Sequence, residues 1–244
     1  MPTIKLILEY DGTAYAGWQR QPDQPTIQKA IEAAIEGVTQ MHVPVIGAGR
    51  TDAGVHAMGQ TASFCIDRSM APHEWTRALN AHLPETITVR SASIMPDEFH
   101  ARHSAKGKLY EYRLLNRGER PAVDRHYCWH IYKPLNDAAM NHAAMALIGS
   151  HDFSSFETQP TKNEDPICCL QHLTVYRQGD QLRIEAYADR FLKQMVRSIV
   201  GTLVEVGLNK RQPDSLKAIL TARDRSAAGK TAPPQGLFLV RVDY

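Results

Sequence analysis

The sequence has few of the features that mark specialised classes of protein. Its 244 residues include only 4 cysteines, 7% aromatic residues and a formal net charge of +2. It has no long apolar run, and its first residues show no basic leader followed by an apolar core. We therefore expect no membrane span and no signal peptide, and we expect a cytoplasmic protein. The length suits one large domain or two small ones.

The cysteines and histidines do not follow a metal-binding or disulfide pattern. Cys168 and Cys169 are adjacent, Cys65 and Cys128 stand alone, and no two cysteines form a C-x-x-C pair. The 11 histidines are scattered along the chain. We predict reduced, mostly buried thiols and no metal site.

Residues 49–57, Gly-Arg-Thr-Asp-Ala-Gly-Val-His-Ala, are the most informative stretch. The dense glycines allow positive φ angles or a close approach of the backbone to a ligand. Residues i and i+2 of an extended segment share a face, so we expect Arg50 and Asp52 to project together into a cleft. The guanidinium favours the ionised carboxylate, which suits a nucleophile or an electrostatic stabiliser. The alternative is an Asp52 that only bonds its own backbone in a turn.

Several common enzyme classes lack their motifs here. The sequence has no G-x-S-x-G, no Walker lysine and no G-x-G-x-x-G after a strand. Glycosidases need two positioned carboxylates and aspartic proteases need a second aspartate loop, whereas this loop offers one carboxylate. One carboxylate, a neighbouring arginine, an aromatic strand and basic loops remain, and that set suits chemistry on an RNA base.

A basic and aromatic stretch lies near the middle of the chain. Its cations outnumber its three carboxylates, which are Glu111, Glu119 and Asp124. The cations are Arg102, Lys106, Lys108, Arg113, Arg117, Arg120 and Arg125. This excess is an electrostatic footprint for RNA if the side chains share a face, and otherwise a solvated surface. Tyr110 and Tyr112 share one strand face, which suits either a stacking platform for unpaired bases or two core tyrosines.

Hydrophobic periodicity predicts a similar order of elements in both halves: strand, helix, strands, helix, strand. The expected strands cover residues 4–10, 43–46, 56–64, 87–95, 108–113, 172–177, 182–188 and 237–242. The expected helices cover residues 27–38, 72–81, 136–149 and 192–207, with a shorter one from 213, and residues 157–165 are expected to form an exposed loop. We predict an α+β fold of two related domains, residues 1–104 and 105–244, with mainly antiparallel sheets flanked by helices and an active-site cleft between them.

The chain resembles the tRNA pseudouridine synthase I family over nearly its whole length. The motifs that carry the resemblance are Glu9-Tyr10-Asp11-Gly12, Gly17-Trp18-Gln19, residues 49–57, Phe99-His100-Ala101-Arg102, Tyr110-Glu111-Tyr112, residues 191–197 and Gly236-Leu237. Lys108 and Leu109 precede Tyr110 where family members often have basic residues. The resemblance implies isomerisation of uridine to pseudouridine at positions 38, 39 and 40 of the tRNA anticodon stem-loop, by a homodimer that uses no cofactor.

The resemblance also implies roles for particular residues. Asp52 is expected to be the nucleophile, and Tyr110 to pack on the target uracil. Arg50 is expected to fill the space that the flipped base leaves, Arg197 to pair with Asp52, and Leu237 to line the pocket. Two rival functions remain open: a non-catalytic RNA-binding module, and a hydrolase in which Asp52 acts through water.

Overall fold

The structure, a computed structural model, describes residues 1–158 and 165–244. It contains two compact units, one formed by residues 1–106 with 238–244 and the other by residues 107–237. Both units combine helices with a mainly antiparallel sheet, which confirms the predicted α+β class. The first unit includes residues 238–244, which the predicted division after residue 104 assigns to the second domain. Most of the expected loop at 157–165 lies outside the described residues.

The sheet of the first unit has the strand order β4 (Ile87–Met95), β1 (Thr3–Tyr10), β3 (His56–Cys65) and β10 (Leu237–Asp243). Strand β1 is antiparallel to both of its neighbours, and β10 runs parallel to β3. The strand predicted over 43–46 is shorter and later than expected, since β2 covers only Ile46–Gly47 and pairs with β3.

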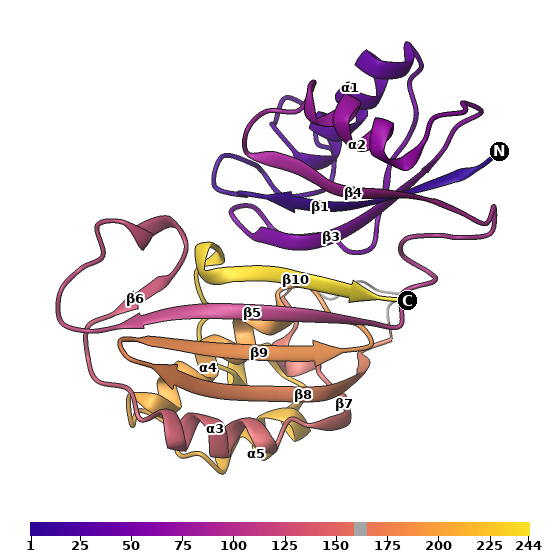
Figure 1. The fold of residues 1–244 in the computed structure, drawn as a ribbon. Helices are drawn as coiled ribbons and strands as arrows, with labels where there is room; N and C mark the ends of the chain where they lie inside the picture. The colour runs from indigo at the N-terminus through magenta and orange to yellow at the C-terminus, as the bar shows by residue number, and fades with distance from the viewer. Residues whose placement is uncertain (159–164) are drawn as a thin grey trace. The chain divides into compact units, whose positions relative to one another are not determined.

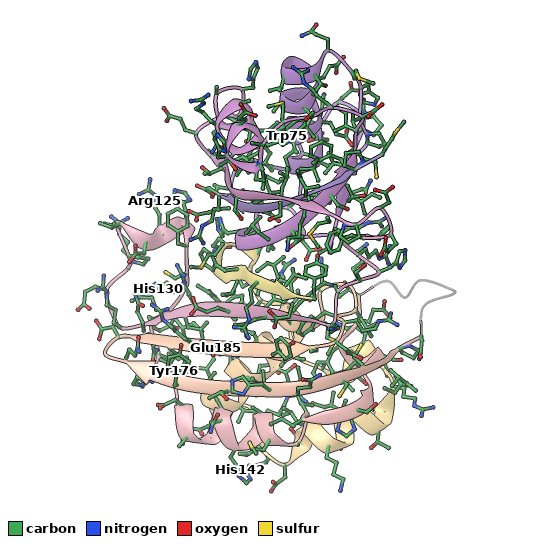
Figure 2. All side chains as sticks on the ribbon, turned by 45° about the vertical axis from the view of Figure 1, so that its right-hand side comes forward. Trp75, Arg125, His130, His142, Tyr176 and Glu185 are labelled. Atoms are coloured by element: carbon green, nitrogen blue, oxygen red, sulfur yellow. The ribbon has the colours of Figure 1, made fainter. Side chains whose placement is uncertain are left out.

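Two helices lie together on one side of this first sheet, α1 (Ile27–Thr39) and α2 (Pro72–Asn80) (Figure 1). Helix α1 begins where predicted, because the Thr26 side chain accepts a hydrogen bond from the Lys29 amide. Trp75 of α2 is fully buried in this unit (Figure 2). The Trp75 ring meets Phe64 of β3 edge-on at 5.4 Å, so α2 is anchored to the sheet by an aromatic contact.

The sheet of the second unit has the order β5 (Gly107–Asn116), β9 (Gln181–Ala188), β8 (Ile167–Gln178) and β7 (Gly149–Asp152), all antiparallel. The short strand β6 (Trp129–Ile131) runs parallel to β5. The predicted hairpin is present as β8 and β9. Tyr176 and Glu185 are neighbours on these two strands, and the phenol donates to the carboxylate at 2.9 Å (Figure 2).

Three helices pack with this second sheet: α3 (Asp137–Met145), α4 (Met195–Gly207) and α5 (Ser215–Ala222) (Figure 1). Asn136 caps α3 as predicted, accepting from the Ala139 amide at 3.0 Å. The helix ends at Met145 rather than near Gly149, because Gly149 takes a φ of +118° and pairs as the first residue of β7. Short 3₁₀ turns occur at η1 (Asp124–His126), η2 (Ser154–Phe156), η3 (Arg225–Ala227) and η4 (Pro234–Gly236).

All four cysteines are free thiols. Cys128 and Cys168 are buried, but Cys65 at the end of β3 is exposed, so the expectation of mostly buried thiols was wrong for that residue.

Within residues 1–158 and 165–244, no helix is long and apolar enough to cross a membrane. In the same ranges, no group of three or more His, Cys, Asp or Glu side chains is arranged to hold a metal ion.

Candidate active site

The predicted site loop connects β2 to β3 in the first unit. Exposure alternates along it, with Arg50 exposed, Thr51 buried and Asp52 half-buried. This alternation is what an extended segment produces. The Val55 amide then donates to the Asp52 carbonyl at 3.1 Å, which closes a turn in which Gly54 has a φ of +76°. Arg50 and Asp52 therefore both lie on the less buried side of a segment whose middle residue points inward.

The backbone of this loop rests on two other segments that are distant in sequence. The Trp18 amide donates to the Thr51 carbonyl at 3.0 Å. A Cβ atom at Gly17, where φ is +100°, would lie 2.7 Å from that same carbonyl oxygen. A Cβ atom at Gly12 would run into the Val55 carbonyl. Three of the family-like motifs are thus one packed cluster, in which glycines allow the backbones to approach.

Trp18 has the core role that is usual for a single tryptophan. It is 2% exposed. A Cβ atom added at Gly47 would lie 2.5 Å from the indole ring, which places that ring directly against the strand that leads into the site loop. Trp18 therefore anchors the Gly17–Trp18–Gln19 loop from inside the unit.

His56, the first residue of β3, is a part of the site that sequence reasoning did not single out. Its ring is 1% exposed and stacks on Phe238 of β10 at 4.8 Å. Its Nδ1 atom accepts from the Gly12 amide at 3.1 Å and lies 3.2 Å from Asp11 Oδ1. His56 is therefore held by the backbone and side chain of the turn after β1, and it braces the start of β3.

Tyr110 of β5 is the first of three predicted site residues in the second unit. It is 8% exposed, and its ring meets Phe191 edge-on at 5.1 Å. Phe191 belongs to the family-like stretch 191–197, so two motifs of this unit are in contact. Tyr112, on the same strand face, is fully buried, and its hydroxyl donates to the Pro233 carbonyl at 2.7 Å. The structure therefore makes Tyr112 a core residue, which removes it from the stacking platform considered above.

Arg197 lies in α4 and bonds to the segment that connects α5 to β10, and Leu237 is the first residue of β10. Arg197 Nε donates to the Ala232 carbonyl at 2.8 Å, and the Ala232 amide donates to the Arg197 carbonyl at 3.0 Å. These reciprocal bonds fix the direction of the guanidinium. Burial raises the pKa of the Tyr112 phenol, and the positive charge of Arg197 opposes that rise. Leu237 is 5% exposed.

Two arginines of the basic stretch between Arg102 and Arg125 lie beside carboxylates. Arg113 Nε lies 2.7 Å from Glu111 Oε1, and the same carboxylate also holds Arg183 at 3.0 Å, so one negative charge serves two guanidiniums. Arg117 approaches Asp180 at 3.7 Å. Arg125 is exposed in the connection between β5 and β6 (Figure 2). Pairing of this kind lowers the attraction that the stretch can exert on phosphates.

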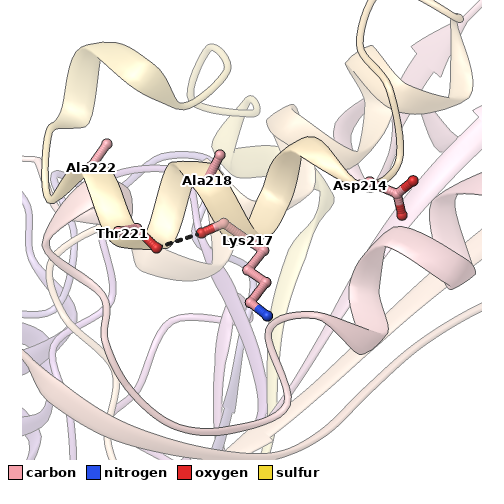
Figure 3. Close-up of a pocket in the computed structure, with 5 residues that line it drawn as sticks. All are labelled: Asp214, Lys217, Ala218, Thr221 and Ala222. Atoms are coloured by element: carbon pink, nitrogen blue, oxygen red, sulfur yellow. Dashed lines mark hydrogen bonds between the residues drawn. The ribbon is translucent and has the colours of Figure 1, made fainter.

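A hollow of 540 Å³ lies on the surface of the second unit, and every residue that lines it belongs to α5 or its N-terminal cap (Figure 3). The lining residues are Asp214, Lys217, Ala218, Thr221 and Ala222. None of the predicted site residues is among them. Side chains from a single helix do not surround a ligand, so we assign no function to this hollow.

Comparisons with known proteins agree with the family-like motifs. A family described as "tRNA pseudouridine synthase" matches residues 6–104 and 143–244. The chain is 46% identical to a tRNA pseudouridine synthase A of Afipia carboxidovorans over 245 residues, covering 100% of both. It is 45% identical to a tRNA pseudouridine synthase A of Allorhizobium ampelinum over 247 residues, covering 100% of this chain and 95% of that protein.

A solved structure described as a Cbf5-Nop10-Gar1 complex contains a chain that aligns with this one at a TM-score of 0.35. The identity is 11%, and the alignment covers 97% of this chain and 58% of that chain. A likeness of this size carries no argument.

The close packing beneath the site loop predicts an unequal response to two glycine substitutions. Gly17→Ala should lower the free energy of unfolding by about 3 kcal/mol, because it adds a steric clash to the strain of a positive φ. Gly179→Ala is the matched control, since Gly179 has a φ of +60° and, apart from its chain neighbours, no atom of the described residues lies within 4 Å of the new methyl position. It should lose only about 1 kcal/mol. Urea denaturation of both variants measures the difference, and equal losses would contradict the packing described here.

Proposed function

The chain belongs to the tRNA pseudouridine synthase family, and we propose that it isomerises uridine to pseudouridine at positions 38, 39 and 40 of the anticodon stem-loop, with Asp52 as the nucleophile. Conversion of tRNA uridine to pseudouridine follows from the family. The observation that supports the rest is the resemblance of residues 49–57 to the family's active-site loop, within the matched range 6–104, on a backbone that leaves Arg50 exposed and Asp52 half-buried.

The proposed reaction begins with removal of the target uridine from the stem, which costs a few kcal/mol of stacking and pairing. Asp52 then attacks either C6 of the base or C1′ of the ribose. The N1–C1′ bond breaks, the uracil turns, and a C5–C1′ bond forms. The bond between Asp52 and C1′ or C6 then breaks, which restores the free carboxylate. The base loses its C5 proton and gains a proton on N1, so atoms balance without a cofactor. Water must be kept out while the base is detached, because it would capture the ribose.

The features of the loop support this division of roles. Asp52 is half-buried, which suits a carboxylate that must meet a base away from bulk water. Arg50 is exposed, which suits a long cation that enters the stem as the base leaves it. Thr51 points inward and separates the two, so each side chain keeps its own direction.

Residues of the second unit complete the proposal. Tyr110 packs on the target uracil, Leu237 lines the pocket, and Arg197 pairs with Asp52. The bonds from Arg197 to Ala232 support this last role, because a guanidinium that is already oriented loses less conformational entropy when it pairs. We also propose that the enzyme acts as a cytoplasmic homodimer.

Defined substrates test the activity and its position. Anticodon stem-loops with a single 5-tritiated uridine at position 38, 39 or 40 should each release tritium to water, because C5 exchanges its hydrogen for a bond to C1′. A stem-loop labelled only at position 32 should release none. Release of free uracil instead would support a hydrolase, and tight binding without release would support an RNA-binding module.

Removal of the proposed nucleophile should separate catalysis from binding. Asp52→Ala should abolish tritium release while the dissociation constant for tRNA, measured by filter binding, changes less than about threefold, since most affinity for RNA comes from phosphate contacts. Asp67→Ala, which removes an exposed carboxylate after β3, is the control and should retain wild-type rates. Turnover by Asp52→Ala would end the assignment of Asp52 as nucleophile.

The proposed Arg197–Asp52 pair predicts an energetic coupling. In a double-mutant cycle with Arg197→Met and Asp52→Asn, the effects on the free energy of unfolding should be non-additive by about 1 kcal/mol. Arg177 and Asp137, whose charged atoms lie 3.1 Å apart, provide a reference pair. Additive effects for Arg197 and Asp52, with coupling in the reference pair, would rule the salt bridge out.

A further inference from the structure

A buried hydrogen-bond network lies directly beneath the segment that carries Arg50 and Asp52. The Tyr10 hydroxyl lies 2.8 Å from Thr51 Oγ1, and Gln60 Nε2 lies 3.5 Å from the same hydroxyl. Gln60 Nε2 also donates to the Gly49 carbonyl at 2.9 Å. Tyr10 is 3% exposed, Gln60 is fully buried and Thr51 is 6% exposed. The network therefore holds the residue before Arg50 and the residue before Asp52 from inside the unit.

The partners fix the direction of the two bonds that Gln60 makes. The Gly49 carbonyl only accepts, so the nitrogen of the Gln60 amide must face it. The same nitrogen reaches the Tyr10 hydroxyl oxygen, which is thereby an acceptor. The Tyr10 and Thr51 hydroxyls share one hydrogen bond, in which either hydroxyl can be the donor. Burial raises the pKa of Tyr10 to about 12, although its bonds to Thr51 and Gln60 lower it, so the phenol keeps its proton at neutral pH.

We propose that Tyr10, supported by Gln60, is a positioning residue that sets the direction of the Asp52 carboxylate by holding Thr51. The inference rests on the proposed function of Asp52. Tyr10 does not touch the substrate in this proposal. It acts through a hydroxyl-to-hydroxyl bond one residue away from the reacting group, where a small displacement changes the angle of attack and lowers the rate.

The composition of the network favours positioning over simple core packing. Gln60 Oε1 is buried and has no hydrogen-bond partner within the described part of the chain. A buried carbonyl oxygen without a partner is unfavourable, and an apolar side chain at this position would avoid it. The glutamine is explained if its amide nitrogen is required where it stands, between the Gly49 carbonyl and the Tyr10 hydroxyl.

Removal of one hydroxyl tests the proposal. Tyr10→Phe should lower the single-turnover rate of tritium release by about tenfold. The dissociation constant for tRNA should stay close to wild type, and the melting temperature should fall by only a few degrees, about as much as one lost buried hydrogen bond costs. Thr51→Val, which keeps the shape of the side chain and removes its hydroxyl, should produce a similar loss. The double variant should lose no more than the larger single loss, because both changes break the same bond.

The chain contains a matched control for this experiment. The Tyr15 hydroxyl also bonds a threonine hydroxyl, that of Thr86 at 2.7 Å, but on the exposed surface of the same unit. Tyr15→Phe should keep the wild-type rate. An unchanged rate for Tyr10→Phe, or losses that multiply in the double variant, would overturn the proposal. A rate loss that is fully explained by a smaller folded fraction at the assay temperature would also overturn it.

Two further measurements separate this inference from the proposed function. Amide hydrogen exchange of a peptide spanning residues 49–55 should be faster in Tyr10→Phe than in Tyr15→Phe, and this readout needs no substrate. Equal exchange in both variants would contradict the network. If the wild-type enzyme released no tritium from any stem-loop, the proposed function would fail, whereas the exchange result would still decide whether Tyr10 orders the loop.

Discussion

The close approach of three backbone segments beneath Asp52 is the constraint on which the candidate site depends. Gly12 and Gly17 are glycines because the carbonyls of Val55 and Thr51 occupy the space that a Cβ atom would need. Trp18 then contributes its amide to Thr51 and its ring to the strand before the loop. The direction of the Arg50 and Asp52 side chains is thus set by contacts made through residues that carry no charge.

Because these contacts carry no net charge, salt affects the geometry of the loop and the binding of tRNA differently. Attraction between the protein and RNA phosphates weakens strongly as salt increases. Buried bonds between amides, carbonyls and hydroxyls are screened much less. The loop can therefore keep its geometry under conditions in which affinity for tRNA changes. Recognition and positioning rest on different physical interactions, and either one can vary without disturbing the other.

The sequence was a good guide where periodicity and capping act locally. Helix α1 begins after Thr26 and α3 after Asn136, as their side chains indicate. It failed where tertiary pairing decides, as at Gly149, which joins a strand instead of ending a helix. The site loop was identified through its motif, but the network of Tyr10 and Gln60 was not. These residues are more than 40 positions apart, and only the register of β1 against β3 brings them together.

Strand β10 gives the fold an unusual dependence on the order of synthesis. It pairs with β3 through Phe238 and Leu239, although about 130 residues of a second compact unit intervene in the sequence. During translation one edge of the first sheet stays unpaired, and Phe238, which stacks on His56, is absent, until β10 has left the ribosome. Loss of β10 would therefore impair the unit that carries Asp52, although the strand lies more than 180 residues away from Asp52 in the sequence.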